Sequence, residues 1–287
     1  MTYDAIYNNH KLEHAASSVL KRITGSGEPL KLLYTQPDRA IFLAEVAGVI
    51  LKVYSDVRAL QCDYTVAQQA ASAGLPTAEV LDFEAGPPAV FAMRQVIGVP
   101  LSSRYPGAAR EAGAYLRRFH ELGAQPPFSG GQQRWEDFIL WWANLEIEHA
   151  RQAGVLDEEH ADGLRERFER LRPLLAQRPI GLLHGDLQEE HILLDPQRQK
   201  TLAFLDFIDA QPGDPLLDVA ILTLWDQELT DFVLEGYGSI ANNTETQHLL
   251  THYRLLRLLG SITWLLNWGF TELAEKYRSA LELAIEA

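Results

Sequence analysis

Two neighbouring stretches decide the fold class of this chain: LLHGDLQEEHILLD (residues 182–195) and AFLDFID (residues 203–209). They place Asp186 on a short loop, His191 five residues later, and Asp206 at the end of the next apolar run. Magnesium prefers oxygen ligands and shares them with phosphate groups, so a carboxylate held at the end of a strand suits it. The layout predicts magnesium-dependent phosphoryl transfer, in which the protein mainly positions the reactants and neutralises charge.

Each of these side chains has a predicted role. Asp186 is the candidate base, which orients an acceptor hydroxyl and accepts its proton. Asp206 is predicted to bind magnesium, with His191 as a second group that faces the metal or the phosphates. Because imidazole is a poorer magnesium ligand than oxygen, one alternative leaves His191 hydrogen-bonded within the loop. A zinc site built from His184, Asp186 and His191 is a weaker alternative, since no further nitrogen or sulfur ligand lies nearby in the sequence.

A third segment, GDPLLD at residues 213–218, completes an ordered series with the first two. The series resembles the catalytic core of the aminoglycoside phosphotransferase family, whose members share the protein-kinase-like fold. The resemblance implies an α+β protein with two lobes, a small β-rich N-terminal lobe and a larger, mostly helical C-terminal lobe. It also implies that Asp218 lies at a helix start and holds the catalytic loop through backbone hydrogen bonds, while His184 braces that loop.

Lys52 lies in the middle of an apolar β-run, Val49 to Tyr54, where an ammonium group is costly without a partner. In the kinase-like arrangement such a lysine contacts the α- and β-phosphates of the nucleotide and a carboxylate from the next helix. That helix is predicted here for residues 56–73, and its carboxylate is Asp63, where the family usually has Glu. The alternative for Lys52 is an edge-strand lysine that snorkels to solvent.

The chain is predicted to divide into an N-terminal lobe of residues 1–98 and a C-terminal lobe of residues 99–287. Met93, Arg94 and Gln95 mark the location where backbone groups meet the adenine ring, just before a hinge at residues 97–100. In the first lobe the periodicity predicts a helix from residue 9 or 10 to 23, and strands at residues 30–34, 40–47, 49–54, 79–84 and 89–96. In the second it predicts helices at residues 108–122, 135–150, 158–176, 216–227, 247–266 and 271–285, and a loop at residues 123–131.

The composition is that of an ordinary globular protein and limits the partners. Of the 287 residues, 47% are hydrophobic and 22% are charged, as is typical of a globular enzyme. The formal net charge of −14 disfavours nucleic acid and suits a cationic acceptor, for which Glu190 and Asp209 are the candidate contacts. A single cysteine, Cys62, and the lack of a secretory start or a membrane-spanning run predict a cytoplasmic protein without membrane contact.

Together these features predict an ATP- or GTP-dependent O-phosphotransferase that binds Mg²⁺ and acts on the hydroxyl group of a small molecule. The resemblance implies an aminoglycoside or a related antibiotic as the acceptor. A metabolite kinase for choline, homoserine or a sugar derivative shares the same catalytic block and stays open. A nucleotide-binding module without catalysis also stays open, because Asp63, His191 and the glycine-free turn at residues 35–39 depart from the usual kinase pattern.

Overall fold

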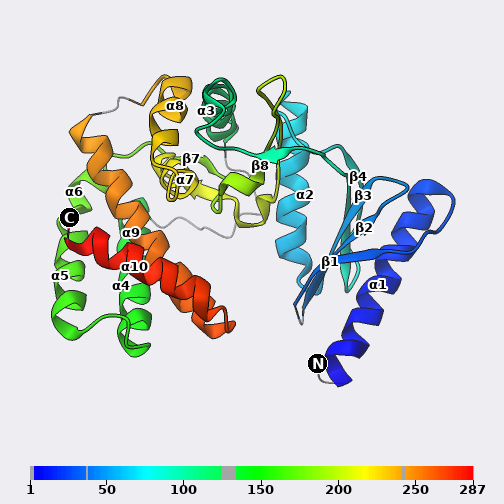
Figure 1. Cartoon of the computed structure of the whole chain (residues 1–287), viewed down its shortest axis with the longest axis horizontal. Helices are drawn as coiled ribbons and strands as arrows, with labels where there is room; N and C mark the ends of the chain where they lie inside the picture. Colours follow the sequence, from blue (N-terminus) through cyan, green and yellow to red (C-terminus); the bar gives the residue numbers. More distant parts are fainter. Residues whose placement is uncertain (1–2, 37, 124–133, 241–242, 287) are drawn as a thin grey trace.

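The computed structural model describes residues 3–36, 38–123, 134–240 and 243–286, and they form a β-rich lobe and a helical lobe (Figure 1). The predicted α+β fold with two lobes is confirmed. The N-terminal lobe holds an antiparallel sheet of five strands in the order β1-β2-β3-β5-β4. Their bounds are Lys31–Gln36 (β1), Arg39–Ala44 (β2), Val49–Tyr54 (β3), Val80–Glu84 (β4) and Ala89–Arg94 (β5).

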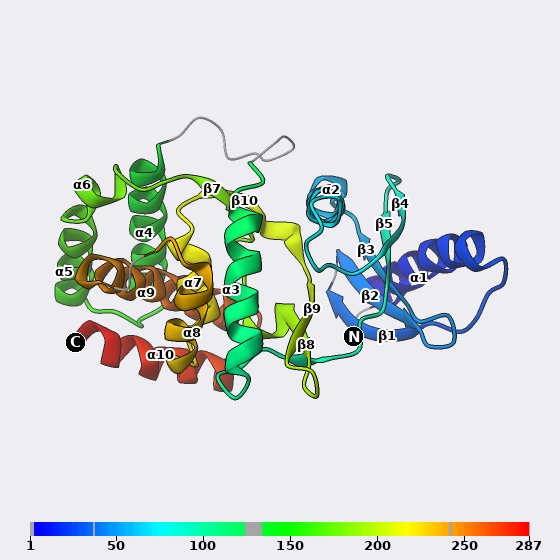
Figure 2. The ribbon, with the colours of Figure 1, turned by 90° about the horizontal axis from the view of Figure 1, so that it is seen from above.

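The middle strand, β3, presents a different kind of side chain on each face. Alternate residues of a strand point to opposite sides of its sheet. The residues of β3 that pack with helix α1 (Tyr3–Thr24) are Val49, Leu51 and Val53. Figure 2 shows α1 on the far side of the sheet from the helical lobe. The alternation therefore directs Lys52 to the other face, toward the helical lobe.

Helix α2 (Val57–Ser72) covers that second face of the sheet. It begins at Asp56, whose side chain accepts a hydrogen bond from the N–H of Arg58 at 2.9 Å, a normal N-cap. It ends before Gly74, whose φ of +70° suits glycine. The predicted helix at residues 56–73 is therefore confirmed to within one residue at each end.

The C-terminal lobe is mostly helical and also contains two small sheets. Its helices are α3 (Pro106–His120), α4 (Trp135–Gln152), α5 (Glu158–Glu169), α6 (Arg172–Leu175), α7 (Leu216–Leu222), α8 (Glu228–Tyr237), α9 (Thr244–Asn267) and α10 (Thr271–Glu286). One sheet pairs β7 (Gly181–Leu183) with β10 (Gln211–Gly213), and the other has the order β6 (Val99–Pro100), β8 (Ile192–Asp195) and β9 (Lys200–Phe204). The short 3-10 turns η1 (Glu189–His191) and η2 (Phe207–Asp209) lie on the connecting segments.

Two predicted helices of this lobe differ from the structure, and one observed helix has no predicted counterpart. The helix expected at residues 158–176 is two helices, α5 and α6, because Pro173 has no N–H to continue the hydrogen-bond ladder. The helix expected at residues 216–227 ends at Leu222, next to Thr223, whose hydroxyl bonds to the carbonyl of Val219 at 2.8 Å. Helix α8 was not predicted. Residues 124–131 of the expected loop lie outside the described residues.

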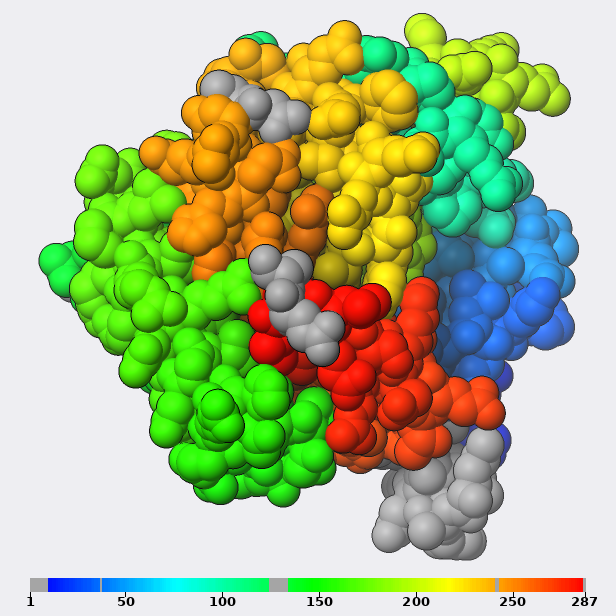
Figure 3. Space-filling model, turned by 60° about the vertical axis from the view of Figure 1, so that its left-hand side comes forward, coloured from blue at the N-terminus to red at the C-terminus, as the bar shows by residue number. Residues whose placement is uncertain are grey.

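The two lobes meet closely beside the hinge. A Cβ added to Gly98 would lie 2.8 Å from the carbonyl oxygen of Leu194 on β8. The N–H of Phe204 bonds to the carbonyl of Pro76 at 2.8 Å and adds a second crossing. Figure 3 shows the last helices of the chain, in red, in front of the N-terminal lobe, in blue. Across the described ranges, no helix has the length and apolar character needed to cross a membrane.

Candidate active site

Lys52 joins the two lobes through its ammonium group. Its Nζ lies 2.5 Å from Asp63 Oδ2 on α2 and 2.6 Å from Asp206 Oδ1 in the C-terminal lobe. Burial disfavours the charged amine, but the two carboxylates outweigh burial and raise the pKa of Lys52 above its usual value. The alternative of a snorkelling edge lysine is wrong, because β3 is the middle strand and Lys52 is only 6% exposed.

Asp63 uses its two carboxylate oxygens for two parts of the site. Oδ2 pairs with Lys52, and Oδ1 accepts a hydrogen bond at 2.9 Å from the N–H of Phe207, the residue that follows Asp206. The neighbouring Cys62 Sγ lies 3.6 Å from the carbonyl oxygen of the same Phe207. The short Asp side chain therefore brings α2 against the segment that carries Asp206.

Asp206 lies just before η2 with a left-handed backbone, φ 69°, which aspartate tolerates better than most residues. Its Oδ1 pairs with Lys52, and its Oδ2 lies 3.8 Å from His191 Nε2. Burial opposes ionisation, but Lys52 and His191 outweigh it and lower the pKa of Asp206 to about 2. The carboxylate is therefore ionised at neutral pH.

His191 and Asp206 place a ring nitrogen and a carboxylate oxygen beside each other. His191 Nδ1 lies 2.6 Å from the carbonyl oxygen of Asp186, so Nδ1 carries a proton, and Nε2 faces Asp206 Oδ2 at 3.8 Å. Within the part of the chain that the structure describes, His, Cys, Asp and Glu form no group of three or more that could hold a metal. This pair would therefore hold magnesium only together with phosphate oxygens and water.

His184 braces the catalytic loop, as the resemblance implied. Its Nε2 lies 2.8 Å from the carbonyl oxygen of Leu205, and its ring stacks on that of His191 with 5.6 Å between centroids. Burial lowers the pKa of His184, so the ring is neutral. Because Nε2 of His184 already bonds to a carbonyl group, this nitrogen is not available as a ligand for a zinc site with Asp186 and His191.

Gly185 lets the catalytic loop approach the segment that follows Asp206. Its φ is +85°, a conformation that favours glycine, and an added Cβ would clash with the carbonyl oxygen of Asp209. The backbone beside Asp186 therefore lies directly against that of Asp209. Only a glycine allows this approach.

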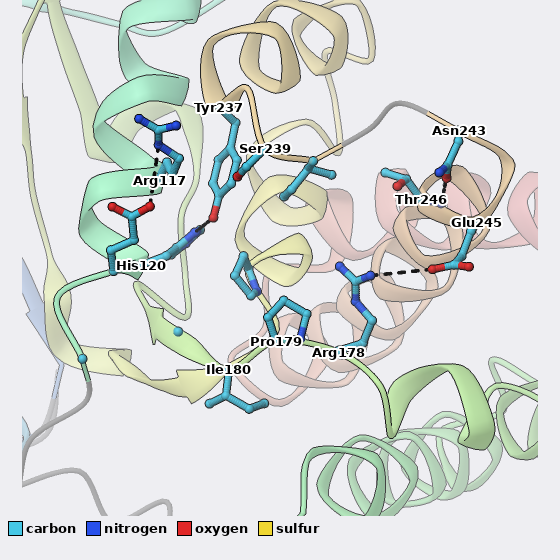
Figure 4. Close-up of a pocket in the computed structure, with 15 residues that line it drawn as sticks. Arg117, His120, Arg178, Pro179, Ile180, Tyr237, Ser239, Asn243, Glu245 and Thr246 are labelled. Atoms are coloured by element: carbon cyan, nitrogen blue, oxygen red, sulfur yellow. Dashed lines mark hydrogen bonds and ion pairs between the residues drawn. The ribbon is translucent and has the colours of Figure 1, made fainter.

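Asp218 is fully buried near the start of α7 and holds the beginning of the catalytic loop. Its Oδ2 accepts from the N–H of His184 at 2.7 Å, and its Oδ1 accepts from the N–H of Gly185 at 2.9 Å. His120 Nε2 lies 3.0 Å from Oδ2, and His120 Nδ1 lies 2.9 Å from the hydroxyl of Tyr237 (Figure 4). Burial opposes ionisation, but His120 outweighs it and lowers the pKa of Asp218, so this anchor carries a charge.

The pocket in Figure 4 lies in the C-terminal lobe. It has a volume of about 490 Å³, and His120 and Tyr237 belong to its lining. Among the described residues that line it, none is Lys52, Asp186 or Asp206. The pocket is therefore separate from the site.

Asp186 is contacted by two side chains that sequence reasoning missed. Gln188 Nε2 lies 3.1 Å from both carboxylate oxygens of Asp186. Arg257 of α9 forms an ion pair with the same carboxylate, donating from Nη2 to Oδ1. The sequence contains one feature that could have identified Arg257. Arg254 and Arg257 lie one helical turn apart in an otherwise apolar part of α9, where each needs a polar partner.

The two predicted acceptor contacts have different surroundings. Asp209 lies on η2 with its side chain partly exposed to solvent, and partial burial together with the nearby charges of Asp186 and Asp206 raises the pKa of Asp209 to about 6. Glu190 lies on η1 and is exposed to solvent. Asp209 is thus part of the cluster around Asp186, whereas Glu190 lies on the rim of the loop.

The predicted adenine location is at the end of β5, where part of the backbone is already bonded. The N–H of Arg94 bonds to the carbonyl of Glu79 and the N–H of Gln95 to that of Gly48, both at 2.8 Å. Met93 is buried in the sheet, between β3 and β4. The N–H groups of Arg94 and Gln95 are therefore engaged within the N-terminal lobe.

Comparison with protein families gives one match that covers most of the chain. The model described as the phosphotransferase enzyme family (APH) matches residues 38–253. These residues include the lysine strand, the catalytic loop, the Asp206 segment and the part of α9 that carries Tyr253. No curated protein sequence matches the chain.

Solved structures share the fold over nearly the whole chain. A thermostable mutant of aminoglycoside phosphotransferase APH(4)-Ia aligns with a TM-score of 0.70 and 21% identity, over 94% of this chain and 98% of that one. A choline/ethanolamine kinase family protein from Mesorhizobium loti aligns with a TM-score of 0.67 and 21% identity, over 99% and 92%. Aminoglycoside phosphotransferase APH(3'')-Id from Streptomyces rimosus aligns with a TM-score of 0.60 and 23% identity, over 85% and 98%.

Proposed function

We propose that this chain, which belongs to the phosphotransferase enzyme family, moves the γ-phosphoryl group of magnesium-bound ATP or GTP to a hydroxyl group of a small molecule. One observation carries the proposal. Lys52 contacts Asp63 and Asp206, and His191 links Asp206 to the backbone of Asp186. Residues from both lobes thus gather the groups that phosphoryl transfer needs.

The nucleotide is proposed to bind between a first lobe of residues 1–98 and a second of residues 99–287. Lys52 would contact the α- and β-phosphates, and Asp206 with His191 would hold magnesium. Magnesium, when bound, neutralises charge on the β- and γ-phosphate oxygens. We place the adenine at residues 93–95 and the following hinge. Because the N–H groups of Arg94 and Gln95 already bond within the sheet, the adenine would be bound by carbonyl groups of these residues and by N–H groups after Gln95.

Asp186 is proposed to accept the proton of the acceptor hydroxyl. The hydroxyl oxygen then forms a bond to the γ-phosphorus, and the bond between that phosphorus and the β–γ bridging oxygen breaks. The electron pair of the broken bond leaves with the nucleoside diphosphate, and the proton stays on Asp186. The backbone contact between Gly185 and Asp209 and the bonds from Asp218 keep this loop in place before substrate binds.

The acceptor is proposed to be cationic, which suits an aminoglycoside or a related antibiotic. Asp209 supplies a carboxylate near Asp186, and the chain as a whole carries a net charge of −14. Glu190 is the second proposed contact, reached from the solvent side of the loop. We place the reaction in the cytoplasm, because the one cysteine, Cys62, is free and buried, as fits a reducing compartment.

Choline is a second candidate acceptor, favoured by an aromatic cluster. Trp264, Trp268 and Phe270 lie around the turn between α9 and α10 and are each nearly half exposed. Trp264 stacks on Phe270 with 6.0 Å between ring centroids, and Figure 1 places this turn at the end of α9 nearer the sheet. Faces of aromatic rings attract quaternary ammonium groups.

Two measurements test the proposal in sequence. Thermal unfolding is followed with Mg-ATP, Mg-GTP or neither, and the stabilising nucleotide is then used for γ-phosphate transfer to aminoglycosides, choline, homoserine and a hexose. We expect one nucleotide to raise the melting temperature by several degrees, since a ligand at 100 times its Kd contributes about 2.7 kcal/mol. We also expect one acceptor class to be phosphorylated. A protein that neither binds a nucleotide nor phosphorylates any acceptor contradicts the proposal.

A further inference from the structure

Arg257 is a charged residue in an apolar part of α9, and its partner is the proposed catalytic base. The neighbouring residues on both sides are buried, namely Leu255, Leu256, Leu258 and Leu259. Arg257 and Asp186 each have side chains that are 23% exposed, so their ion pair lies mostly out of solvent. An arginine in such a place is stable only with a partner, and this partner lies on a different structural element.

The hydrogen bonds to Asp186 are distributed unequally between its two oxygens. Oδ1 accepts from Arg257 and from Gln188, whereas Oδ2 accepts, among the described side chains, only from Gln188. A carboxylate oxygen has two lone pairs in the plane of the group. Both lone pairs of Oδ1 are therefore occupied, and Oδ2 keeps one for another donor.

We propose that Arg257 is a positioning residue that fixes the Asp186 carboxylate so that Oδ2 receives the proton of the acceptor hydroxyl. This inference rests on the proposed phosphotransferase function. Arg257 contacts neither nucleotide nor acceptor in this account and acts through Asp186. A fixed carboxylate matters because a displacement of about 1 Å at a reacting group costs on the order of a hundredfold in rate.

The segment of α9 that carries Arg257 is itself held in place. The hydroxyl of Tyr253 donates to Asp214 Oδ2 at 2.9 Å, and Nη2 of Arg254 lies within 2.9 Å of the hydroxyls of Thr223 and Thr230. These contacts attach α9 to the segment that leads into α7 and to the start of α8. Arg257 therefore approaches Asp186 from a rigid support, as a positioning group requires.

The experiment is a double-mutant cycle on the full chain. It compares wild type, Arg257→Gln, Asp186→Asn and the double variant. Arg257→Lys tests whether a positive charge without the planar guanidinium restores part of the function. Arg278→Gln is the matched control, because it removes an arginine from an exposed ion pair with Glu282 on α10. For each protein we measure the Kd of the Mg-nucleotide, the release of labelled γ-phosphate to water, and kcat and KM with the acceptor found in the panel.

We expect Arg257→Gln to lower kcat between tenfold and a hundredfold while the nucleotide Kd and the acceptor KM change less than twofold. Arg257→Lys should give an intermediate kcat, and Arg278→Gln should match wild type. In the Asp186→Asn background, Arg257→Gln should have no further effect, because residues that act as a unit are not additive.

Other outcomes overturn the inference. An unchanged kcat in Arg257→Gln, or an equal loss in both backgrounds, shows that Arg257 does not act through Asp186. A raised KM with an unchanged kcat shows that Arg257 binds the acceptor instead. These results leave the proposed function intact, whereas a wild-type protein without nucleotide binding or turnover overturns both.

Discussion

Lys52 Nζ lies 2.6 Å from Asp206 Oδ1, although the two residues are 154 positions apart in the chain. The same Nζ contacts Asp63, so one buried ammonium joins the central strand, α2 and the C-terminal lobe. A buried charge that loses its partner is strongly destabilising, whereas removal of both partners costs much less. This difference separates what Lys52 does for stability from what it does for catalysis.

Replacement of Lys52 by Met should lower the free energy of unfolding by about 3 to 5 kcal/mol, because Asp63 is left buried without its cation. The double variant Lys52→Met, Asp63→Asn should recover most of this stability and none of the phosphate transfer. Chemical denaturation and transfer assays measure the two quantities. Lys31→Met is the control, because its ion pair with Glu45 is exposed and should contribute less than about 1 kcal/mol. Recovery of transfer in the double variant would show that Lys52 has no role with the nucleotide.

Gly185→Ala should disrupt the site through the backbone. The added Cβ meets the carbonyl oxygen of Asp209 and also requires a left-handed conformation. Gly154→Ala is the matched control, since its φ is +70° and nothing lies within 4 Å of the added Cβ. The control should lose only about 1 kcal/mol of unfolding free energy. Gly185→Ala should lose more and should also lose transfer. Equal losses of stability in the two variants would argue against the close approach.

Asp218→Asn should weaken the anchor of the catalytic loop. An amide offers one acceptor oxygen, so one of the N–H groups of His184 and Gly185 faces a donor instead. We expect a loss of about 1 to 3 kcal/mol in unfolding free energy and a lower rate of transfer. The control, Asp195→Asn, also removes a carboxylate that accepts two backbone N–H groups, but in the β8–β9 turn. A transfer rate for Asp218→Asn as high as that of the control contradicts the anchor role.

The raised pKa of Asp209 predicts a pH-dependent effect on stability. Its pKa moves from an ordinary 3.8 to about 6 on folding, so the folded protein binds this proton more tightly than the unfolded chain. The ionised group therefore costs stability above pH 6, and the cost disappears as the pH falls toward 4. A shift of about two units corresponds to about 3 kcal/mol at most, and solvent around this exposed side chain screens the repulsion, so the effect on stability is about 1 kcal/mol.

Asp209→Asn removes this cost. In metal-free buffer the variant should exceed wild type in unfolding free energy by about 1 kcal/mol at pH 7.5, and the difference should shrink toward zero near pH 4. Denaturant titrations at several pH values measure it. A difference that is the same at pH 4 and pH 7.5 would show that folding does not raise the pKa of Asp209.

Much of the fold and of the site could be predicted from local patterns. Lys52 stands out because an amine in an apolar strand needs a partner, and the structure shows that Asp63 is one of its partners. The two lobes follow from the change from short apolar runs to helical periodicity after residue 98. The motif spacing predicted that Asp186, His191 and Asp206 lie together, and in the structure His191 contacts the backbone of Asp186 and faces Asp206.

The residues that sequence reasoning missed depend on contacts between distant segments. Arg257 meets Asp186 only because α9 packs beside the catalytic loop, which periodicity does not reveal. His120 reaches Asp218 across 98 positions for the same reason. Local patterns also misplaced the end of α7 and omitted α8, because Thr223 and the residues after it form a turn whose hydrogen bonds depend on neighbouring helices.

The central claim is that Asp186 serves as the base for phosphate transfer in a site whose nucleotide is held by other residues. The most direct test is the rate of γ-phosphate transfer from the preferred Mg-nucleotide in Asp186→Asn, measured beside the nucleotide Kd. We predict a loss of at least about a hundredfold in rate with a Kd within twofold of wild type. A variant that transfers phosphate at close to the wild-type rate would contradict the account.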